Sequence, residues 1–113
     1  MAPRVKKTAV VGSLLILLFL IGFYYIFPGT AFQLLVAAER NLAGLTPNSV
    51  IAQGLWIEYL EGGKGDTVVL LHGFGADKDN WNRFGKHLTP HFRVIAPDLP
   101  GFGESSADPD MDY

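Results

Sequence analysis

The sequence predicts an α/β fold that is preceded by one transmembrane helix. An uncharged apolar run near the N-terminus is long enough to cross a bilayer. Farther along, two apolar runs of strand length flank a segment with helical periodicity, and each run is followed by a glycine-rich loop. A strand–helix–strand unit of this size implies a parallel pair of strands with a crossover helix. A chain of 113 residues has room for at most one small domain of this kind.

The transmembrane prediction rests on residues 8–27, "TAVVGSLLILLFLIGFYYIF", which carry no charge. A helix of that length spans about 30 Å, the thickness of the hydrocarbon core. Residues 1–7 contain three basic side chains, and no acidic side chain occurs before Glu39. Because basic flanks stay on the cytoplasmic side, we expect residues 1–7 to form a cytoplasmic tail and the rest of the protein to lie on the non-cytoplasmic side.

A cleaved signal peptide is the alternative to a retained signal-anchor helix. Gly29, Thr30 and Ala31 are small residues at a possible cleavage site, and cleavage there would release a secreted protein. The hydrophobic region of a signal peptide usually runs for about 7–15 residues, whereas this run is longer and ends in bulky aromatic side chains. Its length therefore favours a retained anchor.

Residues 28–49 are expected to form a juxtamembrane amphipathic helix and a linker. Thr30 can cap the helix, apolar side chains then recur at helical spacing, and Gly44 with Pro47 provides the end. The helix either lies in the membrane interface or packs on the domain that follows, and the sequence leaves both options open.

The remaining residues, 50–113, show strand and helix patterns in alternation. Alternating apolar side chains predict a strand at about 55–60, and "TVVLL" is apolar on both faces, as in a central strand. Asp77 or Asp79 can cap the next helix, and "FRVIAP" predicts another buried strand. Both glycine-rich loops should leave the sheet at the carboxyl ends of the strands, where ligands bind in open parallel sheets.

The first of these loops presents backbone N–H groups at the start of a helix. Gly73 and Gly75 permit turns that other residues cannot make, and the helix adds a partial positive charge. The junction of this loop with the helix therefore suits a negative ligand. One interpretation is a dinucleotide-binding loop, with Asp98 at the expected distance. Lys78 occupies the third glycine position of that motif, which argues against it. The other interpretation is half of an oxyanion hole.

"VVLLHGFGADKDNWNRFGKHL" followed by "FRVIAPDLPGFGESS" resembles the alpha/beta-hydrolase superfamily, within it the lipase and monoacylglycerol-lipase-like branch. The similarity covers about residues 50–106 and corresponds to the N-terminal part of the hydrolase sheet. It implies a membrane-anchored serine ester hydrolase that acts on a small-molecule or lipid ester. Epoxide hydrolysis and carbon–carbon bond hydrolysis occur on related sequences and remain alternatives.

The resemblance also implies roles for individual residues. The backbone N–H of Phe74 would be the oxyanion donor, and its ring would line the acyl pocket beside Gly75. The other motif residues would support the site rather than react: His72, Gly73, Asp98, Gly101, Gly103 and Ser105.

A serine hydrolase of this superfamily also needs a G-x-S-x-G nucleophile followed by an acid and a histidine. The 113 residues contain no G-x-S-x-G, and a triad of Ser105, His72 and Asp98 would need an arrangement that the superfamily does not use. We therefore expect the catalytic triad beyond Tyr113 and expect this chain alone to be inactive. A non-catalytic hydrolase remnant or an anchored binding module is the alternative.

The composition argues against several other classes of function. A net charge of −2 gives no reason to expect a nucleic-acid partner. The chain has no cysteine, and Pro90 interrupts the helix that would align His87 with His91, so we expect no metal site. No cofactor is expected.

Overall fold

The computed structural model describes residues 7–110. The chain forms two compact units, one up to Leu35 and one from Val36 onward. Except for Lys7, the expected cytoplasmic tail lies outside the described residues.

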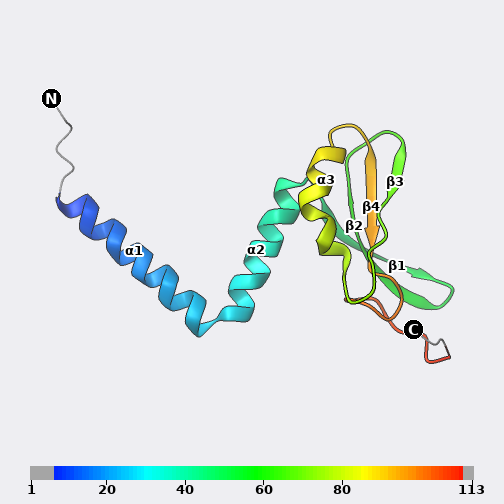
Figure 1. Ribbon diagram of the computed structural model, residues 1–113, viewed down its shortest axis with the longest axis horizontal. Coiled ribbons are helices and arrows are strands. Elements are labelled where there is room, and N and C mark those ends of the chain that lie inside the picture. The colour runs from blue at the N-terminus through cyan, green and yellow to red at the C-terminus, as the bar shows by residue number, and fades with distance from the viewer. Residues whose placement is uncertain (1–6, 111–113) are drawn as a thin grey trace. The chain divides into compact units, whose positions relative to one another are not determined.

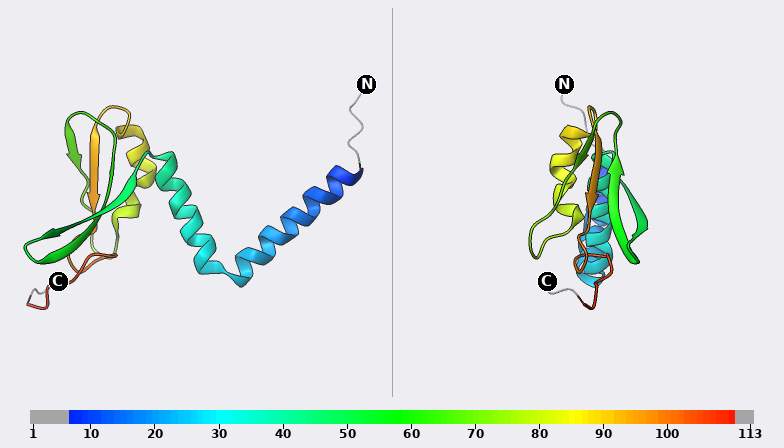
Figure 2. Two further views of the ribbon diagram at one scale, coloured as in Figure 1. Left: turned by 180° about the vertical axis from the view of Figure 1, so that it is seen from behind. Right: turned by 90° about the vertical axis from the view of Figure 1, so that its right-hand side faces the viewer.

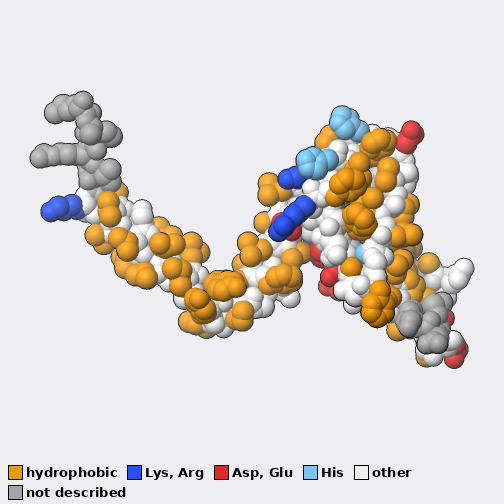
Figure 3. Space-filling view, viewed as in Figure 1, with side chains coloured by type: hydrophobic (Ala, Val, Ile, Leu, Met, Phe, Trp, Pro, Cys, Tyr) orange, Lys and Arg blue, Asp and Glu red, His pale blue; other side chains and the backbone are white. Residues whose placement is uncertain are grey.

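The first unit contains α1, Lys7–Ile26, which matches the predicted transmembrane run to within one residue at each end. Its length and apolar composition are sufficient to cross a membrane, and none of its residues is buried. Figure 3 shows apolar side chains along the visible face of this helix.

The second helix, α2, extends over Pro28–Leu42 and therefore begins before the expected cap at Thr30. Proline is well suited to the first turn of a helix, because the N–H that it lacks has no partner there. The helix ends at Leu42, two residues before the expected stop at Gly44, whose φ of 68° is the left-handed conformation that glycine adopts readily.

The second unit is built on a mixed sheet of four strands in the order β1-β2-β4-β3 (Figure 1). Its strands are β1 (Thr46–Ala52), β2 (Leu55–Gly62), β3 (Thr67–Val69) and β4 (Arg93–Pro97). β2 is antiparallel to both β1 and β4, while β3 and β4 form the predicted parallel pair. The α/β fold class is confirmed.

Strand β1 was not predicted, and it begins inside the range expected to be helix and linker. It forms a hairpin with β2 through Gln53 and Gly54, whose φ angles are 52° and 80°. Two successive left-handed residues are typical of the tight turn that matches the twist of paired strands. The short Gln-Gly sequence between two apolar runs was the available indication of this hairpin.

Strand β3 differs from the expected central strand. Within residues 7–110 it pairs only with β4, so it lies at the edge of the sheet, and it is three residues long. Val69 and Leu71 remain more than half exposed. Apolar side chains of this segment therefore remain exposed in the part of the chain that the structure describes.

The connection between β3 and β4 contains a 3₁₀ turn, η1 (Lys78–Trp81), and then α3 (Asn82–Leu88), on one face of the sheet (Figure 2). Asp77, one of the two expected caps, accepts a hydrogen bond of 2.9 Å from the backbone N–H of Asp79. Trp81 and Leu88 pack against the buried core of the second unit, which consists of Ala43, Leu45, Leu60, Leu70, Val94 and Ala96.

Candidate functional site

Two loops meet at the carboxyl ends of β3 and β4, and a histidine joins them. The backbone N–H of Leu99 donates to Nε2 of His72 at 3.0 Å, and Nδ1 of His72 lies 2.9 Å from the carbonyl oxygen of Gly73. A backbone N–H can only donate, so Nε2 must be the acceptor and Nδ1 carries the proton. His72 is a buried, neutral ring that fastens the first loop to the second.

The other end of the first loop is fastened to the residue before Leu99. The backbone N–H of Lys78 donates to Oδ1 of Asp98 at 2.7 Å. Residues 72–78 are therefore held at both ends by two consecutive residues of the neighbouring loop. Ala76 adds a turn inside this segment by donating to the carbonyl oxygen of Gly73 at 3.2 Å.

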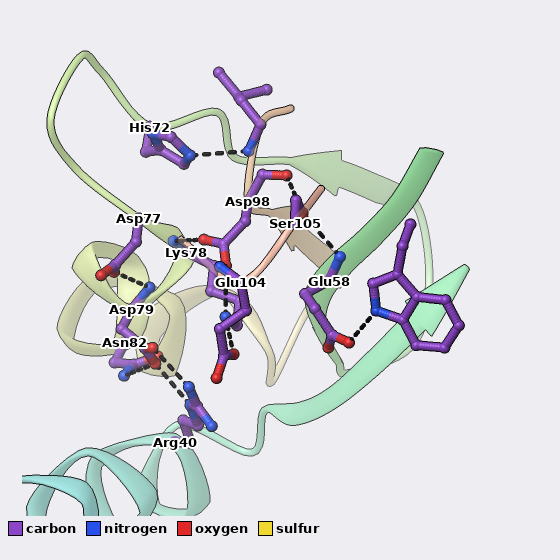
Figure 4. Close-up of polar contacts among 12 residues, drawn as sticks. Arg40, Glu58, His72, Asp77, Lys78, Asp79, Asn82, Asp98, Glu104 and Ser105 are labelled. Atoms are coloured by element: carbon purple, nitrogen blue, oxygen red, sulfur yellow. Dashed lines mark hydrogen bonds and ion pairs between the residues drawn. The ribbon is translucent and has the colours of Figure 1, made fainter. Parts of the chain in front are cut away.

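Asp98 is the centre of this arrangement and is fully buried (Figure 4). Besides the N–H of Lys78, its carboxylate accepts from Nζ of Lys78 at 2.6 Å and from the backbone N–H of Glu104 at 2.9 Å. Burial alone would raise its pKa, but these donors outweigh burial and hold the pKa of Asp98 below its ordinary value. The carboxylate is consequently ionised and fully engaged.

Lys78 is as deeply buried as its partner, with 2% of its surface exposed. Its Nζ lies 2.6 Å from Asp98 and 2.6 Å from Glu104. Burial by itself lowers the pKa of an ammonium group, yet hydrogen bonds to these carboxylates outweigh it, and the pKa of Lys78 is raised. Lys78 and Asp98 are thus paired with each other inside the protein. The Asp98 carboxylate is therefore not available to bind the ribose of a dinucleotide, which argues against that interpretation.

The second loop is fastened to β2 by Ser105. Its hydroxyl donates to the carbonyl oxygen of Asp98 at 2.7 Å and accepts from the N–H of Glu58 at 2.9 Å. Gly101 and Gly103 have φ angles of 84° and 54°, so both adopt left-handed conformations. A Cβ at Gly103 would overlap the carboxylate of Asp98, so only glycine fits there.

These contacts exclude the triad considered for the residues of this chain. The Ser105 hydroxyl is engaged with backbone groups of Asp98 and Glu58, and the ring nitrogens of His72 are engaged with Leu99 and Gly73. Ser105 and His72 therefore do not form the nucleophile–base contact that a triad requires.

Phe74 lies in the middle of the fastened loop. Its residue surface is 90% exposed, and within residues 7–110 no acceptor is hydrogen-bonded to its backbone N–H. Gly75 follows with a φ of 71°, and no atom lies within 4 Å of the position where its Cβ would be. Gly73 likewise has no atom within 4 Å of the position where its Cβ would be, so there is open space on both sides of Phe74 within residues 7–110.

Several side chains that organise the site were not anticipated from the sequence. The sequence indicates for Lys78 only a poor match to the third glycine of a dinucleotide motif, and it indicates no role for Glu104. Arg40 of α2 forms a bidentate ion pair with the Asp79 carboxylate, at 2.7 Å through Nε and 2.6 Å through Nη2. The alternation of charged residues in "ADKDNW" does not distinguish a buried lysine from a solvated one.

Comparison with known proteins agrees with this geometry. Residues 66–113 match the family model of the alpha/beta hydrolase fold. The solved structure of a membrane phospholipase A, a bacterial virulence factor, superposes with a TM-score of 0.74 at 45% identity over 96% of this chain. The chain belongs to the alpha/beta-hydrolase superfamily.

Two curated hydrolases of the superfamily show the same partial overlap. Lipase 1 of Psychrobacter immobilis is 40% identical over 72% of this chain. The 2-hydroxy-6-oxo-6-(2'-aminophenyl)hexa-2,4-dienoic acid hydrolase of Metapseudomonas resinovorans is 40% identical over 67% of it. The chain spans about a quarter of the length of each, 26% and 27%, and 36% of the phospholipase.

Proposed function

We propose that this chain is the N-terminal part of a membrane-anchored serine ester hydrolase of the lipase type. In this proposal the backbone N–H of Phe74 is one donor of the oxyanion hole, and the nucleophile, acid and base lie beyond Tyr113. The observation that carries the proposal is the Phe74 N–H, which has no acceptor within residues 7–110 and belongs to an exposed residue in a loop held at both ends.

The proposed ester hydrolysis would use the Phe74 N–H to stabilise a developing negative charge. When a nucleophile attacks an ester, the carbonyl oxygen gains negative charge, and fixed N–H donors at that point lower the barrier. A donor contributes most when it does not have to reorganise, so the buried supports around His72 and Asp98 favour this role for the loop between them. The likeness to a lipase and to a membrane phospholipase favours an ester or lipid ester as the substrate.

The anchor belongs to the same proposal. Helix α1 would hold the protein in the membrane with its N-terminus in the cytoplasm and the hydrolase domain on the other side. Such an anchor would keep the site close to an insoluble substrate. Cleavage near Ala31 would instead give a secreted enzyme, and an N-terminal sequence of the mature protein distinguishes the two.

The proposal is tested with the protein produced from its full reading frame. We expect hydrolysis of p-nitrophenyl esters and covalent labelling by a fluorophosphonate at a serine within a G-x-S-x-G sequence beyond Tyr113. The 113-residue chain alone should show neither. Ester hydrolysis by that chain, or a reading frame without the serine motif, would contradict the proposal and favour a non-catalytic remnant or binding module.

A second hydrolase chemistry is favoured by one observation. The dienoic acid hydrolase resembles this chain as closely as Lipase 1 does, at 40% identity each. Turnover of a 2-hydroxy-6-oxohexa-2,4-dienoic acid in place of p-nitrophenyl esters would support that alternative.

A further inference from the structure

We propose that Phe102 is a specificity-determining residue, which together with Phe74 forms an apolar corner that favours esters with extended apolar acyl chains. The inference rests on the proposed ester hydrolysis. Phe102 belongs to the second loop, and neither its sequence motif nor the oxyanion chemistry assigns it a role.

The ring of Phe102 contacts two rings of the other loop. Its centroid is 5.6 Å from that of His72, with the two planes at 72°. It is also 5.8 Å from the centroid of Phe74, at 80°. Both are edge-to-face contacts, the arrangement that aromatic rings prefer. Phe102 therefore connects the buried support of the loop to its exposed tip.

The position of Phe102 is well defined by its own backbone. Its N–H donates to the carbonyl oxygen of Leu99 at 2.9 Å, and its carbonyl oxygen accepts from the N–H of Ser105 at 3.2 Å. Leu99 is the same residue that donates to His72. The ring that neighbours Phe74 is thus fixed by the framework that also fixes the first loop.

Within residues 7–110, most of the Phe74 surface makes no contact with other residues. It is 90% exposed, and both flanking glycines have open space where a side chain would begin. A large apolar ring in water is unfavourable, and contact with an alkyl chain would remove its surface from water. The rings of Phe74 and Phe102 meet at nearly right angles. In this proposal an alkyl chain contacts both rings at the corner between them.

The charges around the corner also favour a neutral chain. His72 is uncharged in its hydrogen-bonded form, because Nε2 accepts from Leu99. The Lys78 ammonium is directed to Asp98 and Glu104. A carboxylate at the end of the acyl chain would therefore lose water without gaining either cation, whereas a methyl group would lose nothing.

The test compares acyl chain lengths in the protein from the full reading frame. We would measure kcat and KM for p-nitrophenyl acetate and p-nitrophenyl octanoate with the unmodified enzyme, Phe102→Ala and Phe102→Leu. Phe92→Ala is the matched control, since Phe92 precedes β4 and so lies at the opposite end of that strand. The decisive quantity is the ratio of kcat/KM for octanoate to that for acetate.

We expect Phe102→Ala to lower this ratio about tenfold, mainly through a higher KM for octanoate, because the longer chain alone reaches the corner. Phe102→Leu, which stays apolar, should retain part of the preference and secures the test if the alanine variant does not fold. Phe92→Ala should keep the ratio of the unmodified enzyme.

The outcomes separate this inference from the function on which it rests. An unmodified enzyme that hydrolyses neither ester overturns the proposed function and this inference with it. An active enzyme whose ratio is the same in folded Phe102→Ala and Phe102→Leu overturns the inference alone. A similar fall in the ratio for Phe92→Ala would also overturn it, because the effect would then not be local.

Discussion

Nε2 of His72 accepts a hydrogen bond of 3.0 Å from the backbone N–H of Leu99, and this contact joins the two loops of the candidate site. The geometry makes His72 an acceptor toward the backbone and leaves it no free nitrogen for a substrate proton. His72 therefore supports the loop that carries Phe74.

This role predicts different results for two His72 variants. In His72→Gln the side-chain oxygen can still accept from Leu99, so kcat should fall about tenfold or less, whereas loss of a catalytic base typically costs about ten-thousand-fold or more. His72→Ala leaves the part-buried N–H of Leu99 without its acceptor and should destabilise the protein by about 1 kcal/mol. Kinetics and urea unfolding check both. A complete loss of activity in a folded His72→Gln would contradict a purely supporting role for His72.

The buried pair of Lys78 and Asp98 predicts a strong dependence of stability on both partners. Lys78→Met removes the ammonium and leaves a buried carboxylate without its cation, which should lower the free energy of unfolding by about 3–5 kcal/mol. The double variant Lys78→Met/Asp98→Asn removes both charges and should be less destabilised than the single one. Denaturant unfolding of the full-length protein measures the difference. Equal stability of the single variant and the unmodified protein would contradict the account.

Three glycines of the loops predict a graded series of alanine substitutions. Gly73→Ala places its Cβ in open space and should change the unfolding free energy little. Gly75→Ala must adopt a left-handed conformation, at a cost of about 1–2 kcal/mol. Gly103→Ala adds overlap with the Asp98 carboxylate to the same strain and should cost the most. Thermal unfolding of the three variants checks the order, and a Gly103→Ala protein as stable as Gly73→Ala would be inconsistent with this geometry.

The lowered pKa values of Asp98 and Asp79 predict a loss of stability in acid. For Asp79, burial raises the pKa but the contacts with Arg40 and Asn82 outweigh it. A carboxylate whose pKa is lower in the folded protein than in the unfolded chain stabilises the fold fully above the ordinary value of about 3.9. That contribution disappears as the pH falls through the folded pKa. In Asp79→Asn, the unfolding free energy should depend less steeply on pH below about pH 4. An unchanged slope would contradict the cited shift.

Much of the fold was predictable because its causes are local. The uncharged run that became α1, the parallel pair β3 and β4, and the end of α2 just before Gly44 follow from composition, periodicity and backbone freedom. The hairpin of β1 was not predicted. All seven residues of this strand are exposed, and its sequence, TPNSVIA, lacks the alternation of apolar and polar residues that indicates a half-buried strand.

The site was only partly predictable, for a different physical reason. The motifs indicated which backbone turns were needed, and the structure places their residues in two adjoining loops. The burial of Lys78 depends on Asp98 and Glu104, which lie 20 and 26 positions away. Such a pairing forms only when the sheet brings the loops together, so no local pattern indicates it.

The most direct test of the proposed oxyanion donor replaces the Phe74 amide in the full-length enzyme with an ester, by incorporating phenyllactate at that position. This change removes the N–H and keeps the ring, so it isolates the donor from the apolar corner. The account predicts that kcat for p-nitrophenyl acetate falls about 100- to 1,000-fold while KM changes little. A folded ester variant whose kcat stays within about twofold of the unmodified enzyme would contradict it.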